Sequence, residues 1–319
     1  MGKILITGGA GFVGRNLIRH IRSFFEDAHI TVIDDLSEDA QTFFDQGLVN
    51  QVDRLYAGFD VTDPRFSEWA RSWHFDLCIH CAAVVRGKLN QVQSPLSVAK
   101  NLAIDAAVIS AVNNGLAKEL IYFSSCAAYG AAFQSAPKAT PNFESQLIVG
   151  SQYQPLYPPE GMYGWCKVMG EVLCSQLSNT KVTVLRPFGG YGTDQKDTYP
   201  FPAIVKRVQR GDDPVVIWGS GKQVRDWIHV KDICRLAFEA HSKNAGVVNL
   251  GTGVETSFTE LAIQVMTKAE RSEYVLRNSP DKPEGVAYRV ADTVKMNRFR
   301  MFAHIRLEQG IEMALAGEL

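Results

Sequence analysis

The residues best suited to proton transfer are a tyrosine and a lysine four positions apart, and two adjacent serines. Tyr163 and Lys167 stand in YGWCK, so on a helix their side chains share one face. A phenol has a pKa of about 10 and is a poor base at neutral pH, but a neighbouring ammonium stabilises the phenolate. Ser124 and Ser125 follow the apolar run LIYF, where a hydroxyl could share a substrate's proton. A lone Y-x-x-x-K is more often a solvated helix face, so the catalytic interpretation depends on accompanying features.

A glycine-rich segment near the start of the chain has the features of a dinucleotide-binding loop. Gly8, Gly11 and Gly14 lie between an apolar run at 3–7 and a helical pattern at 12–25. One glycine permits the tight turn, another lets the backbone approach a pyrophosphate, and a third lets helix and strand pack closely. The amino end of the helix then holds the phosphates.

The next strand candidate, ITVID, ends in an acidic residue that predicts the cofactor. Asp34 can accept hydrogen bonds from both hydroxyls of an adenosine ribose and would repel a 2′-phosphate. No basic residue lies between Ile30 and Ala40, so the sequence favours NAD over NADP. A turn or helix-capping role is the alternative for Asp34. The pair Asp60-Val61 could hold the adenine, although a simple turn aspartate fits equally well.

Strand and helix patterns alternate along the first half of the chain, which predicts a parallel sheet covered on both faces. The strand candidates are 3–7, 30–34, 54–58, 77–83, 120–125 and 182–187, and the main helix candidates are 12–25, 95–114 and 163–177. After about residue 187 glycine and proline become frequent and the elements shorten. We therefore expect a nucleotide-binding domain over 1–186 and a smaller lobe over 187–319 that is interleaved with it, so that some segments return to the nucleotide-binding domain. The run PVVIW, a helix near 231–241 and the run VVNLG are assigned to this lobe.

Composition excludes several classes of protein. The chain has 319 residues, 46% hydrophobic and 21% charged, with a net charge of −1. This is ordinary globular composition, without the basic field that binds nucleic acid or an anionic membrane surface. No apolar run reaches the roughly 18 residues of a membrane span, and six cysteines are too few for a disulfide scaffold. We expect a cytoplasmic protein with reduced thiols and no metal site.

The motifs together resemble those of the extended short-chain dehydrogenase/reductase family, the NAD-dependent nucleotide-sugar epimerases and dehydratases. The matching segments, in family order, are GGAGFVG, VIDDL, FDVTD, HCAA, SSCAAYG, YGWCK, RPFGGYG, WGSGKQVRDWIHVKD and VVNLGTG. The resemblance implies an α/β fold: a Rossmann domain, which is a doubly wound parallel sheet, with a small carboxy-terminal lobe for a nucleotide-diphosphate sugar. It also implies retained NAD and a homodimer formed through a four-helix bundle by the helices at 95–114 and 163–177.

The resemblance also implies the roles of individual residues. It implies Ser125, Tyr163 and Lys167 as the catalytic set, with Ser124 and Cys126 beside them. The implied cofactor-binding residues are Gly8, Gly11, Phe12, Val13, Gly14, Asp34, Asp35, Asp60, Val61, Ala82, Ala83, Asn101, Tyr163, Lys167 and Pro187. The implied substrate-binding residues are Arg86, Ser125, Tyr163, Gly189, Tyr199, Trp218, Arg225 and Arg289.

Arg225 resembles the family arginine that binds the nucleotide diphosphate, and a guanidinium fork suits phosphate in charge and geometry. An ion pair with Asp226 is its alternative. For other substrate residues the sequence also leaves two interpretations. Arg86 and Lys88 could bind a sugar carboxylate or lie in a solvated loop, Tyr199 could donate a proton or pack, and Trp218 could stack on a base or fill the core of the lobe.

Two departures from the family bear on the reaction. Two positions after the catalytic hydroxyl, related dehydratases carry a glutamate and GDP-sugar 3,5-epimerases a cysteine, whereas this chain has Ala127. Alanine supplies neither acid nor base, which argues against 4,6-dehydration and 3,5-epimerisation. Cys126 is one residue away; it could titrate if its pKa were lowered, but a small buried thiol fits better. Gly189 replaces the usual asparagine, leaving either space or a bare backbone amide.

The sequence therefore predicts an NAD-dependent epimerase that inverts C4 of a nucleotide sugar through a transient 4-keto intermediate. Alternatives are a nucleotide-sugar 4-ketoreductase or dehydrogenase, and a 3,5-epimerase in which Cys126 acts. A non-catalytic dinucleotide-binding protein is a further alternative, although such relatives commonly lose the tyrosine or the lysine, and both are present here.

Overall fold

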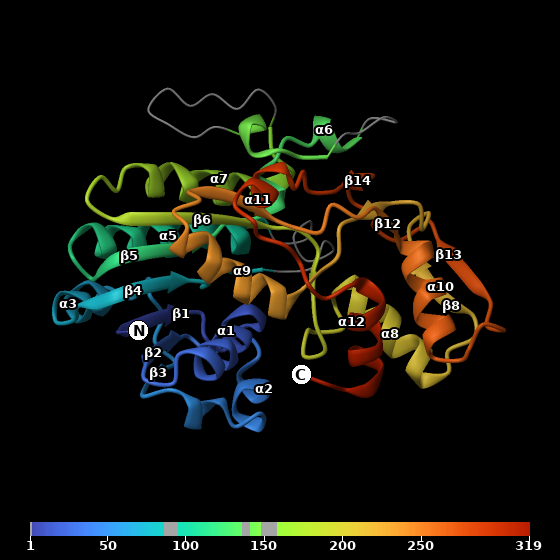
Figure 1. Ribbon diagram of the computed structural model, residues 1–319, viewed down its shortest axis with the longest axis horizontal. Coiled ribbons are helices and arrows are strands. Elements are labelled where there is room, and N and C mark those ends of the chain that lie inside the picture. Colours follow the sequence, from blue (N-terminus) through green and yellow to red (C-terminus); the bar gives the residue numbers. More distant parts are fainter. Residues whose placement is uncertain (1, 86–94, 136–140, 148–157) are drawn as a thin grey trace.

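A parallel sheet of seven strands forms the larger part of the protein (Figure 1). The computed structural model describes residues 2–85, 95–135, 141–147 and 158–319. The strand order is β11-β6-β5-β4-β1-β2-β3, with the bounds β1 (Lys3–Thr7), β2 (His29–Asp34), β3 (Arg54–Ala57), β4 (Phe75–His80), β5 (Ala117–Phe123), β6 (Lys181–Pro187) and β11 (Val247–Leu250). The order reverses at β1, and ligands of such sheets bind at the carboxyl ends of the strands near the reversal. The predicted doubly wound α/β fold is confirmed.

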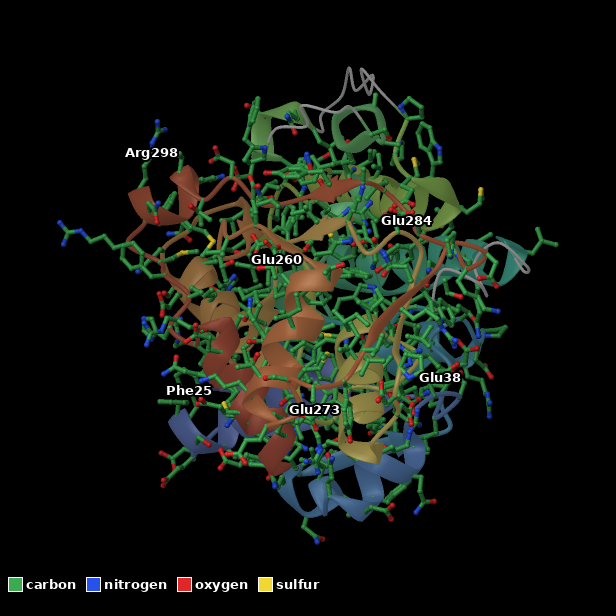
Figure 2. All side chains as sticks on the ribbon, turned by 90° about the vertical axis from the view of Figure 1, so that its right-hand side faces the viewer. Phe25, Glu38, Glu260, Glu273, Glu284 and Arg298 are labelled. Carbon is green, nitrogen blue, oxygen red and sulfur yellow. The ribbon has the colours of Figure 1, made fainter. Side chains whose placement is uncertain are left out.

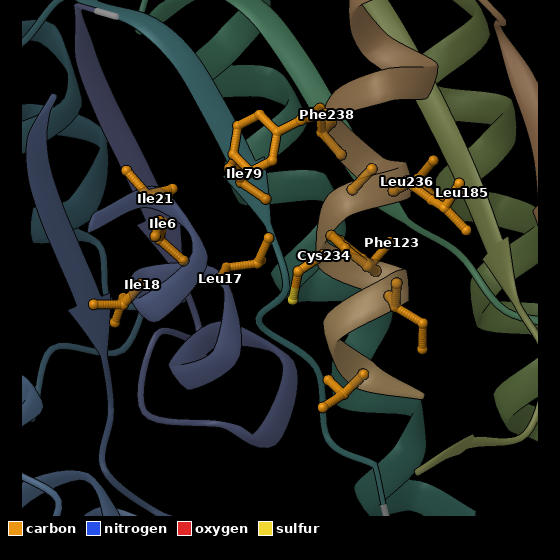
Figure 3. Packing of buried hydrophobic residues seen from close by; sticks show 14 of the residues in the cluster. Ile6, Leu17, Ile18, Ile21, Ile79, Phe123, Leu185, Cys234, Leu236 and Phe238 are labelled. Carbon is orange, nitrogen blue, oxygen red and sulfur yellow. The ribbon is translucent and has the colours of Figure 1, made fainter. Parts of the chain in front are cut away.

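Alternating side chains of the strands build two separate cores, one on each face of the sheet. Ile4 and Ile6 of β1 pack in the core that α1 (Phe12–Phe24) and α9 (Val230–Ser242) cover, and Figure 3 shows Leu17, Ile18 and Cys234 in this layer. Leu5 points the other way, into the core beneath α3 (Arg65–Arg71), α5 (Pro95–Asn113) and α7 (Gly161–Ser175).

The start of helix α7 lies near the carboxyl end of β5. The helix then packs against α5 along the second face of the sheet (Figure 1). The short η2 (Cys126–Ala128), which directly follows β5 and the two serines, also contacts α7. This packing brings the amino-terminal half of α7 to the ligand-binding edge of the sheet.

The smaller lobe has its own hydrophobic core on the right of Figure 1. It contains α8 (Pro200–Arg210), α10 (Phe258–Lys268) and α12 (Leu307–Ala316), with β8 (Val215–Trp218) paired to β13 (Leu276–Ser279). Figure 2 looks onto this lobe, with Glu260 near the start of α10 and Glu273 beyond its end. A three-stranded sheet, β12-β9-β14, lies toward the larger domain and consists of β12 (Thr256–Ser257), β9 (Val224–Arg225) and β14 (Tyr288–Arg289).

Two elements that the sequence placed in the smaller lobe belong to the larger domain. Strand β11 pairs with β6 in the main sheet, and α9 packs beside α1 on its face. The chain therefore crosses back after β10 (Ile228–His229), which pairs with β7 (Gly190–Tyr191). The remaining short helices are α2 (Ala40–Asp45), η1 (Leu48–Gln51), α6 (Ala132–Ser135), η3 (Glu144–Gln146) and α11 (Val294–Arg298). None of the described helices has the length and apolar character needed to cross a membrane.

Candidate active site

A cavity of about 530 Å³ opens between the carboxyl edge of the sheet and the smaller lobe. The predicted residues that line it are Gly8, Gly11, Phe12, Val13, Gly14, Ala83, Ser124, Ser125, Cys126, Tyr163, Lys167, Pro187, Gly189, Tyr199, Arg225 and Arg289. An adjoining cavity of about 320 Å³ shares Ser125, Tyr163 and Arg225 with it and adds Trp218 and Glu160. A further cavity of about 430 Å³, beside α11 and α12, contains no predicted site residue.

The glycine loop presents bare backbone to the cavity. Gly8 has a φ of +73°, and a Cβ there would lie 2.6 Å from the amide nitrogen of Ala82. A Cβ on Gly14 would collide with the carbonyl oxygen of Gly8. Gly11 directly precedes the first turn of α1, so free amides at the start of the helix face the same space. Close backbone packing therefore requires glycine at both positions, and the tight loop that results leaves the start of the helix open for the pyrophosphate of a dinucleotide.

Several predicted cofactor residues do not line the cavity, namely Asp34, Asp35, Asp60, Val61, Ala82 and Asn101. The Asp34 carboxylate accepts hydrogen bonds from the amides of Ala10 at 2.9 Å and Leu36 at 2.8 Å. Burial raises the pKa of Asp34, although these two hydrogen bonds act in the opposite direction. Asp34 thereby ties the glycine loop to the end of β2, and its part in ribose binding stays a prediction.

Asp60 and Asn101 have protein partners of their own. Asp60 accepts a 2.8 Å hydrogen bond from the ammonium of Lys100 and a 2.9 Å bond from the amide of Thr62, as a turn aspartate does. The Asn101 amide group bonds both the amide and the carbonyl of Val84, at 2.6 and 3.0 Å. Asn101 therefore positions the segment that follows β4 at the edge of the cavity.

Tyr163 lies on the first turn of α7 and lines both cavities. Burial raises the pKa of this phenol well above its ordinary value, and Cys126 and Asp105 raise it further. The hydroxyl of Ser125 acts in the opposite direction by hydrogen bonding. Ser125 also accepts a 3.1 Å hydrogen bond from the amide of Ala127, which fixes its side chain at the start of η2.

The two serines have different partners. Ser124 donates a 2.5 Å hydrogen bond to the buried carboxylate of Glu171, one turn beyond Lys167 on α7. Its hydroxyl is thereby engaged in a buried network rather than free for a substrate. Lys167 itself is buried, and its Nζ lies 3.5 Å from the hydroxyl of Tyr122 on β5.

Cys126 reaches the cavity but has the character of a protonated thiol. Burial raises its pKa, although Arg289 and Arg225 act in the opposite direction. The structure therefore favours the interpretation of Cys126 as a small buried thiol next to Ser125.

Arg225 on β9 lines the cavity and forms no direct ion pair with the described residues, although Glu160 and Glu284 favour its charged form. No described carboxylate lies within 4 Å of its guanidinium, which donates to the carbonyl of Val224 at 2.7 Å and lies over the ring of Phe258. Burial, together with the neighbouring Arg289, lowers the pKa of Arg225 to about 10. The alternative of an ion pair with Asp226 is wrong, because that carboxylate accepts from the amides of Thr252 and Gly253 instead.

Arg289 on β14 is paired, and its partner is a residue that the sequence analysis missed. Its guanidinium contacts Glu160 at 2.5 Å, and Glu160 lies at the start of α7, three residues before Tyr163. That short spacing was the only available signal, since it places an acidic side chain beside the helix turn that carries Tyr163. Glu38, Asp39 and Lys196 also line the larger cavity without having been indicated by the sequence, and Lys196 forms ion pairs with both carboxylates.

The remaining predicted substrate residues divide as follows. A Cβ on Gly189 would lie 2.5 Å from the carbonyl oxygen of Asp226, so this glycine leaves no empty space and is required by close packing. Trp218 is 38% exposed and lines the smaller cavity, so it does not fill the core of the lobe. Tyr199 donates to the carbonyl of Val85 at 3.2 Å. Arg86 and Lys88 lie outside the described residues.

The model of the NAD dependent epimerase/dehydratase family matches residues 4–251. A putative GDP-L-fucose synthase 2 of Arabidopsis thaliana is 26% identical, over 97% of this chain and 89% of that protein. A putative UDP-glucose 4-epimerase of Methanocaldococcus jannaschii is also 26% identical, over 97% of this chain and 96% of that protein.

Among solved structures, the fold is shared with a Thermus thermophilus UDP-glucose 4-epimerase in complex with NAD. The TM-score is 0.83 at 21% identity, and the match covers 99% of this chain and 98% of that one. The family resemblance inferred from the motifs is confirmed. The chain belongs to the NAD-dependent epimerase/dehydratase family, and NAD is its cofactor.

Proposed function

We propose that the protein inverts C4 of a nucleotide-diphosphate sugar through a transient 4-keto sugar. The single observation that carries the proposal is the composition of the cavity: Tyr163, Lys167 and Ser125 share it with the glycine loop and with the guanidinium of Arg225. Ala127, the position at which related dehydratases hold a glutamate, supplies no acid or base to the adjoining cavity.

The residues divide the work between proton transfer and anchoring. When bound, NAD supplies a hydride acceptor that can return the hydride to either face of the sugar. The Tyr163 phenolate takes the proton of the sugar 4-hydroxyl, directly or through Ser125, and gives it back when the hydroxyl re-forms. Lys167 stabilises the phenolate by its charge. Arg225 and Arg289 hold the diphosphate, so that the 4-keto sugar can turn about the diphosphate bonds without leaving.

A second candidate is an epimerase-reductase acting at C3 and C5, and it is favoured by one observation. Cys126 lines the cavity close to Arg225 and Arg289, where a thiol could exchange a carbon-bound proton. Its raised pKa opposes this role, because a proton acceptor at carbon needs the thiolate.

The decisive experiment is incubation with a panel of nucleotide sugars in D₂O. The panel contains UDP-glucose, UDP-N-acetylglucosamine, UDP-glucuronic acid and dTDP-glucose, together with a GDP-4-keto-6-deoxysugar for the second candidate, and NMR identifies the products. C4 inversion by hydride transfer gives the 4-epimer without solvent deuterium on carbon. Deuterium at C3 or C5 would establish the second candidate, and a 4-keto-6-deoxy product would establish dehydration; either result overturns the proposal.

Arg225 should supply much of the affinity for the diphosphate. Charge-assisted hydrogen bonds contribute about 1.5–3 kcal/mol, so Arg225→Met should weaken binding of UDP or GDP about 10- to 150-fold, measured by isothermal titration calorimetry. Arg271→Met, in the smaller lobe outside the described cavities, is the matched control and should bind as the wild type does. An unchanged Kd for Arg225→Met would remove Arg225 from the diphosphate site.

Helices α7 and α5 carry an exposed apolar surface through which the predicted homodimer could form. Met162, Trp165 and Met169 recur on one face of α7 and are 44, 38 and 42% exposed, and Leu102 on the adjacent α5 is 41% exposed. Apolar side chains gathered in this way mark an interaction surface. Light scattering should give a dimer mass for the wild type and a monomer for Trp165→Glu, whereas Ile263→Glu on α10 should remain dimeric. A monomeric wild-type protein at all concentrations would contradict the prediction.

A further inference from the structure

The buried ammonium of Lys167 has no direct carboxylate partner among the described residues, but one hydroxyl separates it from a carboxylate. Its Nζ lies 3.5 Å from the hydroxyl of Tyr122 and 4.9 Å from the centre of that ring. The same hydroxyl donates a 2.6 Å hydrogen bond to Oδ2 of Asp105 on α5. A charge removed from water requires a compensating charge nearby, and Asp105 supplies it here through Tyr122.

Asp105 is itself held from the opposite side. Its Oδ1 lies 3.1 Å from Nε2 of His80 on β4, and Nδ1 of His80 lies 2.7 Å from the hydroxyl of Thr7 at the end of β1. All of these side chains are at most 3% exposed. The polar chain therefore runs from the strand that leads into the glycine loop to the middle of α7, through a water-excluded layer in which electrostatic interactions are strong.

Helix α7 leaves space for this series of hydrogen-bonded side chains because it has a glycine, Gly170, at the point of contact. Gly170 lies three residues beyond Lys167, and a Cβ there would collide with the Tyr122 hydroxyl and lie 2.6 Å from Oδ2 of Asp105. The helix backbone thus packs directly on the hydrogen bond between tyrosine and aspartate. The polar groups of Asp105, Tyr122 and Lys167 therefore pack together against the backbone of Gly170.

We infer that Asp105 is the counter-ion of Lys167, and that Asp105 and Tyr122 are positioning residues that hold Lys167 in the cavity it shares with Tyr163 and thereby set the pH range in which Tyr163 acts. The inference rests on the proposed role of Tyr163 and Lys167. Burial alone would raise the pKa of Asp105, but Lys167 and His80 outweigh it and keep this pKa below its ordinary value, so that the carboxylate is ionised. The negative charge of Asp105 also raises the pKa of Tyr163, after burial and Cys126.

Lys167 and Tyr163 are surrounded by titratable groups, and these groups set the background for any pH effect. They are Cys166, Glu171 and Cys174 on α7, His80 on β4 and Cys81 after it, Tyr122 on β5, Cys126 on η2, Asp105 on α5, and Tyr199 ahead of α8. Glu171 is paired with Arg186 on β6, so its charge is already compensated. Asp105 is thus the carboxylate whose removal changes the field at Lys167 and Tyr163.

Replacing Asp105 by Asn keeps the shape of the side chain and removes its charge. Because Asp105 raises the pKa of Tyr163, its loss should lower that pKa. The acid limb of the pH profile of kcat/KM, which reports deprotonation of the free enzyme, should then move to lower pH by about one unit. The kcat at the pH optimum should fall about tenfold, because Lys167 is no longer held in place, with little change in KM.

A second measurement does not depend on turnover. In the protein without substrate, acetylation of individual lysines by acetic anhydride, quantified by mass spectrometry, reports how firmly each amine is held as an ammonium. Labelling of Lys167 should be at least about threefold faster in Asp105→Asn than in the wild type. Tyr122→Phe, which removes only the bridging hydroxyl, should shift both readouts in the same direction by less, and it serves if Asp105→Asn does not fold.

Asp232→Asn is the matched control, since Asp232 is a similarly buried aspartate that is paired with Arg235 and does not line the cavity. Its pH profile and Lys167 labelling should match the wild type. Unchanged labelling and an unchanged acid limb in folded Asp105→Asn and Tyr122→Phe would overturn the inference. If no nucleotide sugar is turned over by the wild type, the proposed function fails, whereas the labelling result still decides whether Asp105 compensates Lys167.

Discussion

Replacing Tyr163 by Phe should lower turnover of the accepted nucleotide sugar by about 10²–10⁴-fold, the usual contribution of general acid–base catalysis. The ring of Tyr163 stays in the cavity, so packing and cofactor binding should persist, but no group remains to take the proton of the sugar hydroxyl. Ser125 cannot replace it, since an isolated hydroxyl is too weak a base without a partner that accepts the proton. The measurement is product formation by NMR, together with the amount of NAD that copurifies.

The control is Tyr274→Phe, which deletes a phenol oxygen from the smaller lobe outside the described cavities and should turn over at the wild-type rate. Retained NAD with lost turnover in Tyr163→Phe identifies a chemical role for the phenol. A Tyr163→Phe protein with the wild-type rate would contradict the assignment of Tyr163 as the proton carrier, and with it the proposed mechanism.

Replacing Glu171 by Leu should destabilise the protein by about 3–5 kcal/mol, because it leaves a buried arginine without its carboxylate. The Glu171 carboxylate pairs with Nη2 of Arg186 at 2.6 Å and Nε at 2.9 Å, and both side chains are at most 1% exposed. Ser124 donates to the same carboxylate. Urea denaturation followed by circular dichroism measures the free energy of unfolding.

The double variant Glu171→Leu/Arg186→Met tests whether the loss of stability comes from the buried, unpaired charge of Arg186. Removing both charges should recover a large part of the loss, because replacing a buried ion pair by apolar side chains is often nearly neutral. Glu312→Gln, in the exposed pair with Lys268, is the comparison and should change the free energy of unfolding by no more than about 1 kcal/mol. A single variant as stable as the wild type would show that the pair does not stabilise the fold.

The sequence by itself determined the sheet, the glycine loop and the position of Tyr163 and Lys167 on one helix. Each of these follows from local rules: apolar runs bounded by glycine predict buried strands, and a spacing of four places two side chains on one helix face. The observed β1 at Lys3–Thr7 and α1 at Phe12–Phe24 agree with the expected ranges within a residue. The family motifs added the order of the elements and the NAD cofactor.

Only the tertiary structure decided which partner each polar side chain finds. Ser124 and Ser125 are neighbours in the sequence, yet one bonds Glu171 inside the protein and the other interacts with Tyr163 at the cavity. Arg289 meets Glu160, 129 residues away in the chain. The register of distant elements sets these contacts, and spacing along one segment carries no information about it.

The same distinction explains why the sequence predicted an interleaved lobe without identifying which segments return to the main sheet, and why it did not single out Asp105. Strand β11 joins the main sheet because β6 offers it an open edge. Asp105 resembles any polar residue of a half-buried helix until α5, β5 and α7 are packed together, when it proves to lie one hydroxyl away from Lys167. Periodicity determines which elements form, whereas the electrostatic environment of a catalytic group depends on how those elements meet.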